Sequence, residues 1–369
     1  MIRFIVVRAL IPFVFLVTAC DSERADGLED SEVTNFTFED FERTSSVALK
    51  VVNEVPAFLN ATRMKLIDDR LFIRDSGDLD NLYKVYKTET FEQEVFFGKI
   101  GDGPNEFVGP YTVYVQNDTL FIQDLTGGKV KLYRYSELIE NKRMVHLGEL
   151  PFGLEQGQTI YDFALYDGNY VTLTSNSKRI KVLDQNLELQ AQFGEYPDIP
   201  LDYSLSEEEM IYKNLLNYAD ASWGMSSIFN DRVVLKYSYL QLIEVFDLKE
   251  KKLLLKIVGP NPQYFPPEIK YYPKSDMYFP VKETSFSSYI RLQTAKVGFF
   301  LLYSGQPLTS MPTGTGKTIM FFDWEGKPKS LYHLNKEIVA FQVDLKREKL
   351  YCLLSEEFDN RLAVTKLDL

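Results

Sequence analysis

The chain has 369 residues, of which 45% are hydrophobic and 25% charged, and its formal net charge at pH 7 is −12. This acidity argues against a nucleic-acid partner, because such binding depends on Lys and Arg contacts with phosphate. The two histidines exclude a His-rich metal site, and the 27 Phe and 23 Tyr residues favour strands.

The N-terminus has the pattern of an export signal. Arg3 and Arg8 precede an apolar run over 9–19, which is shorter than the roughly 20 residues that span a bilayer and has the length of a signal-peptide core. The four residues that end at Cys20, Val-Thr-Ala-Cys, resemble the lipobox of bacterial lipoproteins. This resemblance implies cleavage after residue 19 and a lipid on Cys20 that anchors the chain to a membrane. An ordinary secretory signal and an N-terminal membrane helix are the alternatives.

Residues 20–32 are acidic and nearly free of large apolar side chains, so they are expected to form a flexible tether. The folded domain is expected over 33–369. With Cys20 lipidated, Cys352 is the only thiol left and an intramolecular disulfide is excluded. Cys352 lies in an apolar strand, which favours a core residue over a nucleophile.

A repeated pattern of strands and turns follows the tether. Six copies recur at intervals of about 45 to 65 residues, each with an apolar strand after a turn, an alternating strand and a final strand. Turns such as Asp167-Gly168 and Asn230-Asp231 separate the strands. The pattern predicts an all-β, six-bladed β-propeller of four-stranded antiparallel blades. The absence of alternating helices argues against an α/β fold.

The last copy ends near Leu369, after its third strand. A strand at about 47–52 precedes the first complete blade and is expected to supply the missing outer strand. This pairing would join the two ends of the chain, close the ring and remove an open sheet edge.

Two insertions interrupt the repeat. A capping box at Ser206 and an apolar stripe behind it predict a helix over 206–219. The second insertion, over 260–289, is rich in proline and aromatic residues. A long loop in a compact domain is often functional, so its aromatic residues are the candidate binding surface, although the rings could equally cover one face of the propeller. The candidate contact residues are Tyr264, Phe265, Tyr271, Tyr272, Tyr278 and Phe279.

Three loops resemble ligand-binding loops, but a purely structural role explains each of them better. Residues 314–318 lack the first glycine of a phosphate loop and precede a strand rather than a helix, so no nucleotide is expected. Residues 75–81 depart from the calcium-loop pattern and suit a polar hairpin turn. Residues 101–107, Gly-Asp-Gly-Pro-Asn-Glu-Phe, suit a crossover between blades in which Phe107 fills the core.

A Ser-His-Asp triad would have to use His146 or His333, which are far apart in sequence.

The order of these features resembles the TolB-like six-bladed propeller lipoproteins of Bacteroidota. The resemblance rests on the segment 98–107, the capped helix, the segment 302–305 and the segment 319–328. It implies a propeller at the cell envelope, on the periplasmic face of the outer membrane or on the cell surface. The acidic residues after Cys20 also resemble surface-export signals of some of these lipoproteins. The family carries no assigned reaction or ligand, so it supplies no catalytic residues.

These observations favour a lipid-anchored binding module, without a required cofactor, for a protein, peptide or glycan partner. The alternative is a lactonase-like six-bladed enzyme with a central Ca²⁺ held by carboxylates and Asn. A purely structural role in the envelope is a third hypothesis. The sequence does not identify the ligand, the membrane face or the oligomeric state.

Overall fold

The computed structural model describes residues 32–151, 160–174, 178–195, 226–261, 269–272, 277–280, 286–309, 314–356 and 359–368. The chain divides into two units, Met1–Asp30 and Ser31–Leu369, and the described residues all belong to the second. The predicted signal peptide, Cys20 and the predicted helix over 206–219 lie outside the described residues.

Three sheets of four antiparallel strands make up the first part of the second unit. In each sheet the strands follow one another in chain order. The strands are β4 (Ala61–Ile67), β5 (Arg70–Asp75), β6 (Tyr83–Lys87) and β7 (Gln93–Phe97); β10 (Pro110–Gln116), β11 (Thr119–Asp124), β12 (Lys129–Arg134) and β13 (His146–Pro151); and β14 (Ile160–Tyr166), β15 (Asn169–Thr174), β16 (Ile180–Leu183) and β17 (Leu189–Phe193).

The next four antiparallel strands carry a fifth strand on their outer edge. They are β18 (Ser226–Phe229), β19 (Arg232–Lys236), β20 (Leu242–Asp247) and β21 (Lys252–Val258), with β1 (Glu32–Asn35) outside β21.

The last sheet is larger because one long strand serves two sets of strands. β27 (Pro328–Asp344) pairs through its first half with β26 and through its second half with β28. The remaining strands of this sheet are β24 (Tyr289–Ala295), β25 (Gly298–Tyr303), β26 (Gly316–Phe322), β28 (Lys349–Ser355), β29 (Asn360–Lys366), β2 (Arg43–Val47) and β3 (Lys50–Val51).

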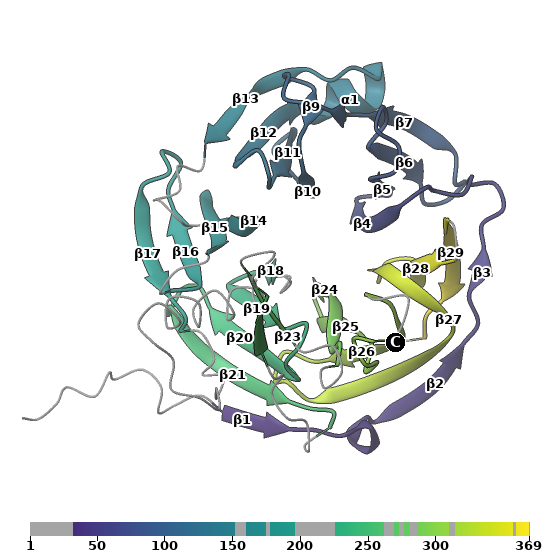
Figure 1. Ribbon diagram of the computed structural model, residues 1–369, viewed down its shortest axis with the longest axis vertical. Coiled ribbons are helices and arrows are strands. Elements are labelled where there is room, and N and C mark those ends of the chain that lie inside the picture. The colour runs from purple at the N-terminus through teal and green to yellow at the C-terminus, as the bar shows by residue number, and fades with distance from the viewer. Residues whose placement is uncertain are drawn as a thin grey trace, which may run out of the picture. The chain divides into compact units, whose positions relative to one another are not determined.

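The sheets are arranged around a common centre, as the blades of a propeller are (Figure 1). The first strand of each set faces the centre, and each contacts the next: β4 with β10, β10 with β14, β14 with β18, β18 with β24, β24 with β27, and β27 with β4. The described residues thus form an all-β, propeller-like arrangement of four-stranded antiparallel sheets.

The N-terminal segment of this unit runs along the outer edges of three sets of strands. β1 pairs in parallel with β21, β2 pairs in parallel with β27, and β3 pairs antiparallel with β29. The predicted strand over 47–52 is therefore only two residues long, and Val51 lies opposite Ala363. The two parallel outer strands before it were not predicted, since polar residues dominate them and give no strand signal.

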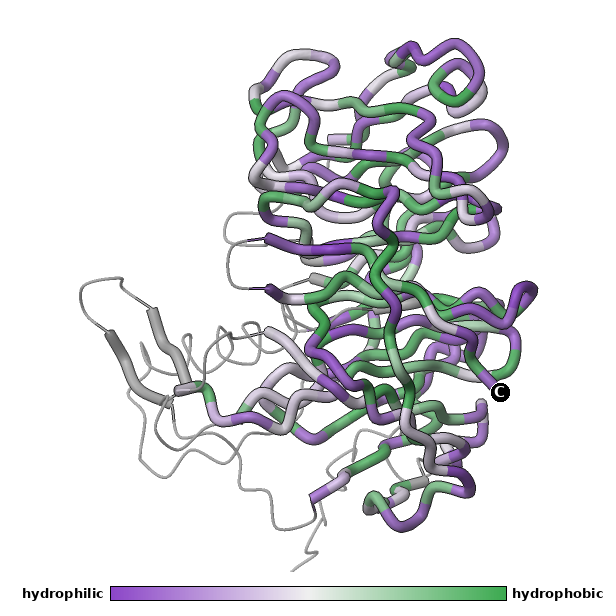
Figure 2. The backbone as a smooth tube through the Cα atoms, turned by 90° about the vertical axis from the view of Figure 1, so that its right-hand side faces the viewer, coloured by the Kyte–Doolittle hydropathy of each residue, from purple (hydrophilic) through white to green (hydrophobic). Residues whose placement is uncertain are grey.

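The core lies within and between the sheets. The second strand of each set is buried on both faces, as Leu71, Phe72 and Ile73 on β5 illustrate. The side view shows hydrophobic residues along the strands and hydrophilic residues in the connecting loops (Figure 2). Cys352 lies inside this core at 0% exposure, and burial raises the pKa of its thiol, as expected for a packing residue.

Short elements complete the fold: the 3-10 helix Phe38–Asp40, α1 (Tyr135–Asn141), and the strand pairs β8 (Lys99–Ile100) with β9 (Glu106–Phe107) and β22 (Ile269–Tyr272) with β23 (Met277–Pro280). α1 was not predicted, because seven residues present too little periodicity. It packs through Leu138 and Ile139, and Asp118 accepts a hydrogen bond from the Ser136 amide at its start. Among the described residues, no helix is long and apolar enough to cross a membrane.

Candidate functional site: a basic central cavity

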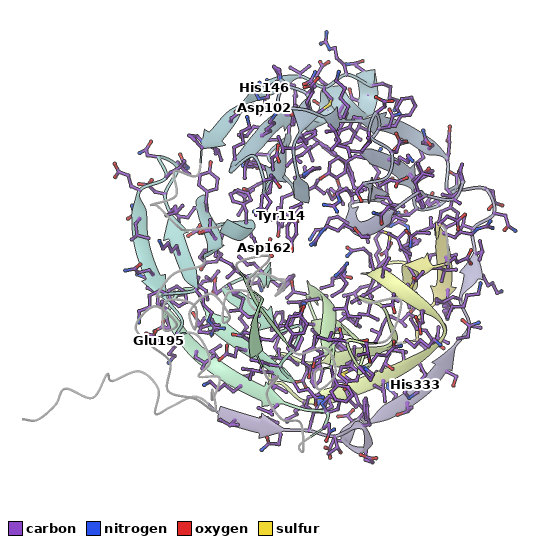
Figure 3. All side chains as sticks on the ribbon, viewed as in Figure 1. Asp102, Tyr114, His146, Asp162, Glu195 and His333 are labelled. Atoms are coloured by element: carbon purple, nitrogen blue, oxygen red, sulfur yellow. The ribbon has the colours of Figure 1, made fainter. Side chains whose placement is uncertain are left out.

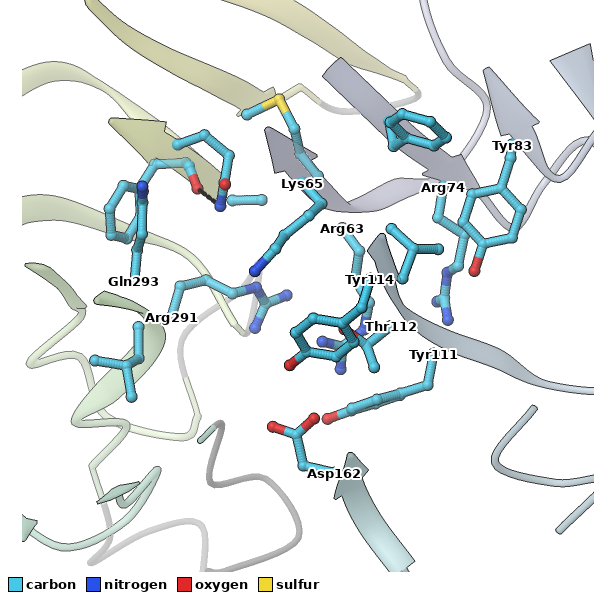
Figure 4. Close-up of a pocket in the computed structure, with 17 residues that line it drawn as sticks. Arg63, Lys65, Arg74, Tyr83, Tyr111, Thr112, Tyr114, Asp162, Arg291 and Gln293 are labelled. Atoms are coloured by element: carbon cyan, nitrogen blue, oxygen red, sulfur yellow. Dashed lines mark hydrogen bonds between the residues drawn. The ribbon is translucent and has the colours of Figure 1, made fainter. Parts of the chain in front are cut away.

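A cavity of about 60 Å³ lies at the centre of the ring of strands (Figure 4). Its lining comes from β4, β5, β10, β14, β24 and β27, with Tyr83 of β6 at one side. Among the described residues, four basic side chains and one carboxylate line it. The charged residues are Arg63, Lys65, Arg74, Arg291 and Asp162.

A shared irregularity in the inner strands positions these side chains. The register shifts between Ala61 and Arg63 on β4, between Ile160 and Asp162 on β14, and between Tyr289 and Arg291 on β24. β10 and β27 carry a comparable shift. A β-bulge bends its strand and re-aims the side chain that follows it. The charged residues directly after the bulges therefore occupy one level of the central cavity.

The next inward-facing position on these strands links neighbouring sets of strands. Gln293 exchanges two hydrogen bonds with the backbone of Val343, at 2.9 and 2.7 Å. Gln342 accepts a hydrogen bond of 3.0 Å from the amide of Leu66. Lys65 occupies the corresponding position on β4, and its Nζ lies 5.0 Å from the centre of the Tyr114 ring. These hydrogen bonds connect the strands around the cavity to one another.

Hydrogen bonds to uncharged groups hold Arg291 and Arg74 in place. Arg291 donates from Nη1 to its neighbour Ile290 at 2.9 Å and from Nη2 to the carbonyl of Thr62 at 3.0 Å. Arg74 donates to the carbonyl of Pro110 and to the Thr62 hydroxyl. Within the described residues, the Nε atoms of both arginines are buried without a hydrogen-bond partner. Neither guanidinium forms an ion pair with a described carboxylate.

The enclosed position of these groups disfavours their charged forms. Burial, with the nearby charges of Arg63 and Arg74, lowers the pKa of Arg291 to about 9. Burial also lowers the pKa of Lys65, against the opposing attraction of Asp162. Burial and the positive charge of Arg63 also lower the pKa of Arg74. The cavity therefore concentrates positive charge in an otherwise acidic chain.

Two tyrosines and Asp162 form the opposite wall of the cavity. The Arg63 guanidinium stacks 3.5 Å from the centre of the Tyr111 ring. Burial and the Asp162 carboxylate raise the pKa of Tyr114 well above its usual value, so its hydroxyl remains a hydrogen-bond donor. The hydroxyls of both tyrosines and the carboxylate of Asp162 point toward one another in Figure 4.

A sequence model of TolB-like 6-blade propeller-like proteins matches residues 37–346. The chain belongs to this family. No curated protein sequence matches the chain.

Solved structures from Bacteroides share the fold of this TolB-like propeller. One is a protein from Bacteroides fragilis that bears the provisional name of an exported protein. It is 13% identical in sequence and superposes with a TM-score of 0.56, and the match covers 91% of this chain and 99% of that protein. A member of the DUF4221 family from Bacteroides vulgatus is 10% identical, with a TM-score of 0.51, over 86% of this chain and 99% of that protein. At these identities the likeness concerns the fold alone.

Four of the six aromatic residues predicted to form a binding surface lie on two paired strands, β22 and β23. Tyr264 and Phe265 lie outside the described residues. β22 and β23 pair so that Tyr271 lies opposite Tyr278, while Tyr272 and Phe279 occupy other positions of the same ladder. Tyr289, at the end of the predicted loop, instead lies in the core at 0% exposure, where its hydroxyl donates to the carbonyl of Gly259.

The loop over 101–107 is the crossover that the sequence predicts. Phe107 is fully buried. The buried ammonium of Lys131 donates to the carbonyl oxygens of Gly103 and Glu106, at 2.7 and 2.6 Å, and the hydroxyl of Tyr133 donates to that of Pro104. Since these contacts engage the loop's own polar groups, its glycines serve the turn.

The acidic turn over 75–81 also has an internal explanation. The Asp75 carboxylate accepts hydrogen bonds from the amides of Leu59 and Asn60 and pairs with Lys84 at 2.8 Å. Burial opposes ionisation of Asp75, but these hydrogen bonds outweigh it and lower the pKa of the carboxyl. Throughout the described parts of the chain, no group of three or more His, Cys, Asp or Glu residues could hold a metal ion.

The segment 314–318 leads, as the sequence predicts, into the strand β26, which begins at Gly316, whereas a phosphate loop requires a helix there. The two histidines also lie apart, with His146 and His333 near the periphery on different sheets, whereas Tyr114 and Asp162 lie near the centre (Figure 3).

The residues of the basic cavity were not predicted from the sequence. The repeat is recognisable in the second and third strands of each copy, whereas the cavity residues lie mainly on the first strands. Aligning the first strands by their hairpin partners would have placed Arg63, Asp162 and Arg291 at equivalent positions, which is the signal that could have found them.

Proposed function

We propose that this chain is an exported, lipid-anchored propeller of the cell envelope whose central cavity binds a ligand. One observation carries the assignment of the site: charged and polar side chains from five inner strands converge on a single cavity. Binding sites are typically concave and carry a few convergent polar groups. Side chains that served only packing would be apolar at these positions.

The cellular location rests on the sequence. The apolar run, the Val-Thr-Ala-Cys motif and the acidic tether support export, lipidation of Cys20 and attachment to the outer membrane, on its periplasmic face or at the cell surface. The provisional name of the Bacteroides fragilis relative agrees with export.

We further propose that the fold is a six-bladed propeller closed by its N-terminal segment. The ring of contacts among the six inner strands, with β27 counted through its second half, supports this number of blades. The pairing of β3 with β29 supports closure. A closed ring would fix the side chains of the cavity relative to one another.

The aromatic insertion over 260–289 remains a proposed second contact surface, through Tyr264, Phe265, Tyr271, Tyr272, Tyr278 and Phe279, for a protein, peptide or glycan. The calcium-dependent lactonase alternative is less well supported. Among the described lining residues, four are basic and one is a carboxylate, a donor set that repels a divalent cation rather than ligating it.

Ligand capture with a blocked cavity tests the proposed site. Thr112 lines the cavity, so Thr112→Trp would fill it, whereas Thr90→Trp changes an exposed residue in a hairpin. The purified chain and both variants are incubated with a small-molecule extract of the producing cells, washed and examined by native mass spectrometry. We expect the wild type and Thr90→Trp to retain a compound that Thr112→Trp does not. Retention by all three, or by none, would contradict a ligand site in the cavity.

A further inference from the structure

We propose that the central cavity binds an oxyanion, a phosphate or carboxylate group, through the guanidinium groups of Arg74 and Arg291 and the ammonium of Lys65. This inference rests on the proposed function, because it names the chemistry of the ligand for the same cavity.

The sign of the local charge is the first argument. The whole chain is acidic, with a net charge of −12, yet basic residues outnumber carboxylates four to one in the described lining of this cavity. These four basic side chains are half-buried, and holding like charges together away from bulk water is unfavourable unless a counter-charge accompanies them. An anion would supply that counter-charge.

The second argument is the arrangement of the donors. Carbonyl and hydroxyl groups already orient Arg74 and Arg291, while each retains a buried Nε–H group without a described partner. A guanidinium presents its N–H groups as a planar fork that matches carboxylate and phosphate oxygens. Two such groups, held in place before binding, form a receptor for an oxyanion.

The size and walls of the cavity agree with this chemistry. A volume of about 60 Å³ is enough for several water molecules, so the cavity can hold one small anionic group, free or at the end of a larger ligand. Tyr111 and Tyr114 face the same space (Figure 4). Their hydroxyl groups can donate to an oxyanion.

Asp162 provides a test in which the expected change in affinity is opposite to that for the arginines. Its side chain lines the cavity and is 4% exposed, so its negative charge repels an anion bound beside it. Replacing the carboxylate with the isosteric amide should strengthen oxyanion binding, whereas removing a guanidinium should weaken it. A cavity for a cation or a neutral ligand would not respond in this way.

Isothermal titration calorimetry of the purified full-length chain tests the inference. The probes are inorganic phosphate, sulfate and acetate, with chloride to control for ionic strength. The variants are Arg291→Gln, Arg74→Gln and Asp162→Asn, and Arg134→Gln is the matched control because Arg134 lies at an exposed end of β12. Arg291→Lys retains the charge and guards against a variant that fails to fold.

At least one oxyanion should bind saturably to the wild type and to Arg134→Gln. The affinity should fall by about tenfold or more in Arg291→Gln and Arg74→Gln, fall less in Arg291→Lys, and rise in Asp162→Asn. Preference for phosphate and sulfate, or for acetate, identifies the anionic group, and either supports the inference.

No saturable binding of any oxyanion, or equal affinities in all variants, would overturn the inference. The capture experiment distinguishes this failure from failure of the proposed site: a neutral or cationic compound that Thr112→Trp excludes would preserve the ligand site and reject the oxyanion.

Discussion

Arg291 on β24 donates a hydrogen bond of 3.0 Å to the carbonyl oxygen of Thr62 on β4, 229 positions earlier in the chain. The two strands belong to different sheets. The hydroxyl of the same Thr62 accepts a hydrogen bond from Arg74 at 3.3 Å. Thr62 is thus the meeting point of two guanidinium groups that line the cavity. The geometry of the cavity therefore depends on contacts between strands that lie far apart in the chain.

The affinity for sulfate should fall as the pH is raised from about 7 to about 10. Sulfate keeps its two charges over this range, so the change reports on the protein. The pKa of Arg291 is lowered to about 9 by burial and by Arg63 and Arg74, and that of Lys65 is lowered by burial, so both bases lose charge earlier than they would in water. Calorimetric titrations should give a steeper decline for the wild type than for Arg291→Gln, and parallel curves would contradict this explanation.

The same pKa predicts how stability depends on pH without an anion. Arg291 has a lower pKa in the folded state than in the unfolded chain, so its charged form destabilises the fold. This penalty is full below about pH 9 and is relieved as the pH rises above it. The free energy of unfolding of the wild type, relative to Arg291→Gln, should therefore increase above pH 9 in urea titrations. A difference that is constant with pH would count against a buried, charged Arg291.

Asp124→Ala should destabilise the protein by about 3 kcal/mol, because it leaves three partly buried backbone amides without their acceptor. The Asp124 carboxylate is fully buried and accepts hydrogen bonds from the amides of Val108, Gly109 and Gly127. Asp102→Ala is the control, since its carboxylate is 76% exposed and pairs only at the surface with Lys129, which predicts a change below about 0.5 kcal/mol. Similar unfolding midpoints in urea for both variants would contradict this role.

Closure of the ring can be tested with a cross-link. Val51 and Ala363 are register partners, so Val51→Cys with Ala363→Cys should form a disulfide. Because it closes a loop of most of the chain, the bond should stabilise the fold by up to about 5 kcal/mol. Val47 pairs instead with Leu334, so Val47→Cys with Ala363→Cys should remain reduced. Equal cross-linking of both pairs, or of neither, would contradict closure by β3.

Cys20→Ala should release the chain from the membrane fraction. Two or more acyl chains hold a protein stably at a bilayer, and the lipobox resemblance assigns them to this residue. Labelling with radioactive palmitate should mark the wild type and not the variant. An unlabelled wild type, or a variant that sediments equally with membranes, would show that another segment provides the attachment.

Much of the fold could be predicted from the sequence. The second strands, such as 71–73 and 120–122, are continuous apolar runs between turns, so their burial and spacing are visible without a structure. The outer parallel strands β1 and β2 could not be predicted, since their pairing depends on strands more than 200 residues away.

The cavity escaped prediction for a related reason. Arg63, Asp162 and Arg291 are single polar residues in otherwise ordinary strands, and only the bulges and the ring bring them to one level. The aromatic insertion could be proposed as a contact surface because its composition is unusual over thirty consecutive residues. Composition marks such segments, whereas a site built from one residue per strand leaves no local signal.

A crystal structure of the chain grown with sulfate would test the central claim most directly. We predict a tetrahedral ion in the central cavity, within hydrogen-bonding distance of Arg74 and Arg291, that is absent from the Arg291→Gln variant under the same conditions. A cavity that holds only water while sulfate binds elsewhere on the surface would contradict the claim that this is an oxyanion site.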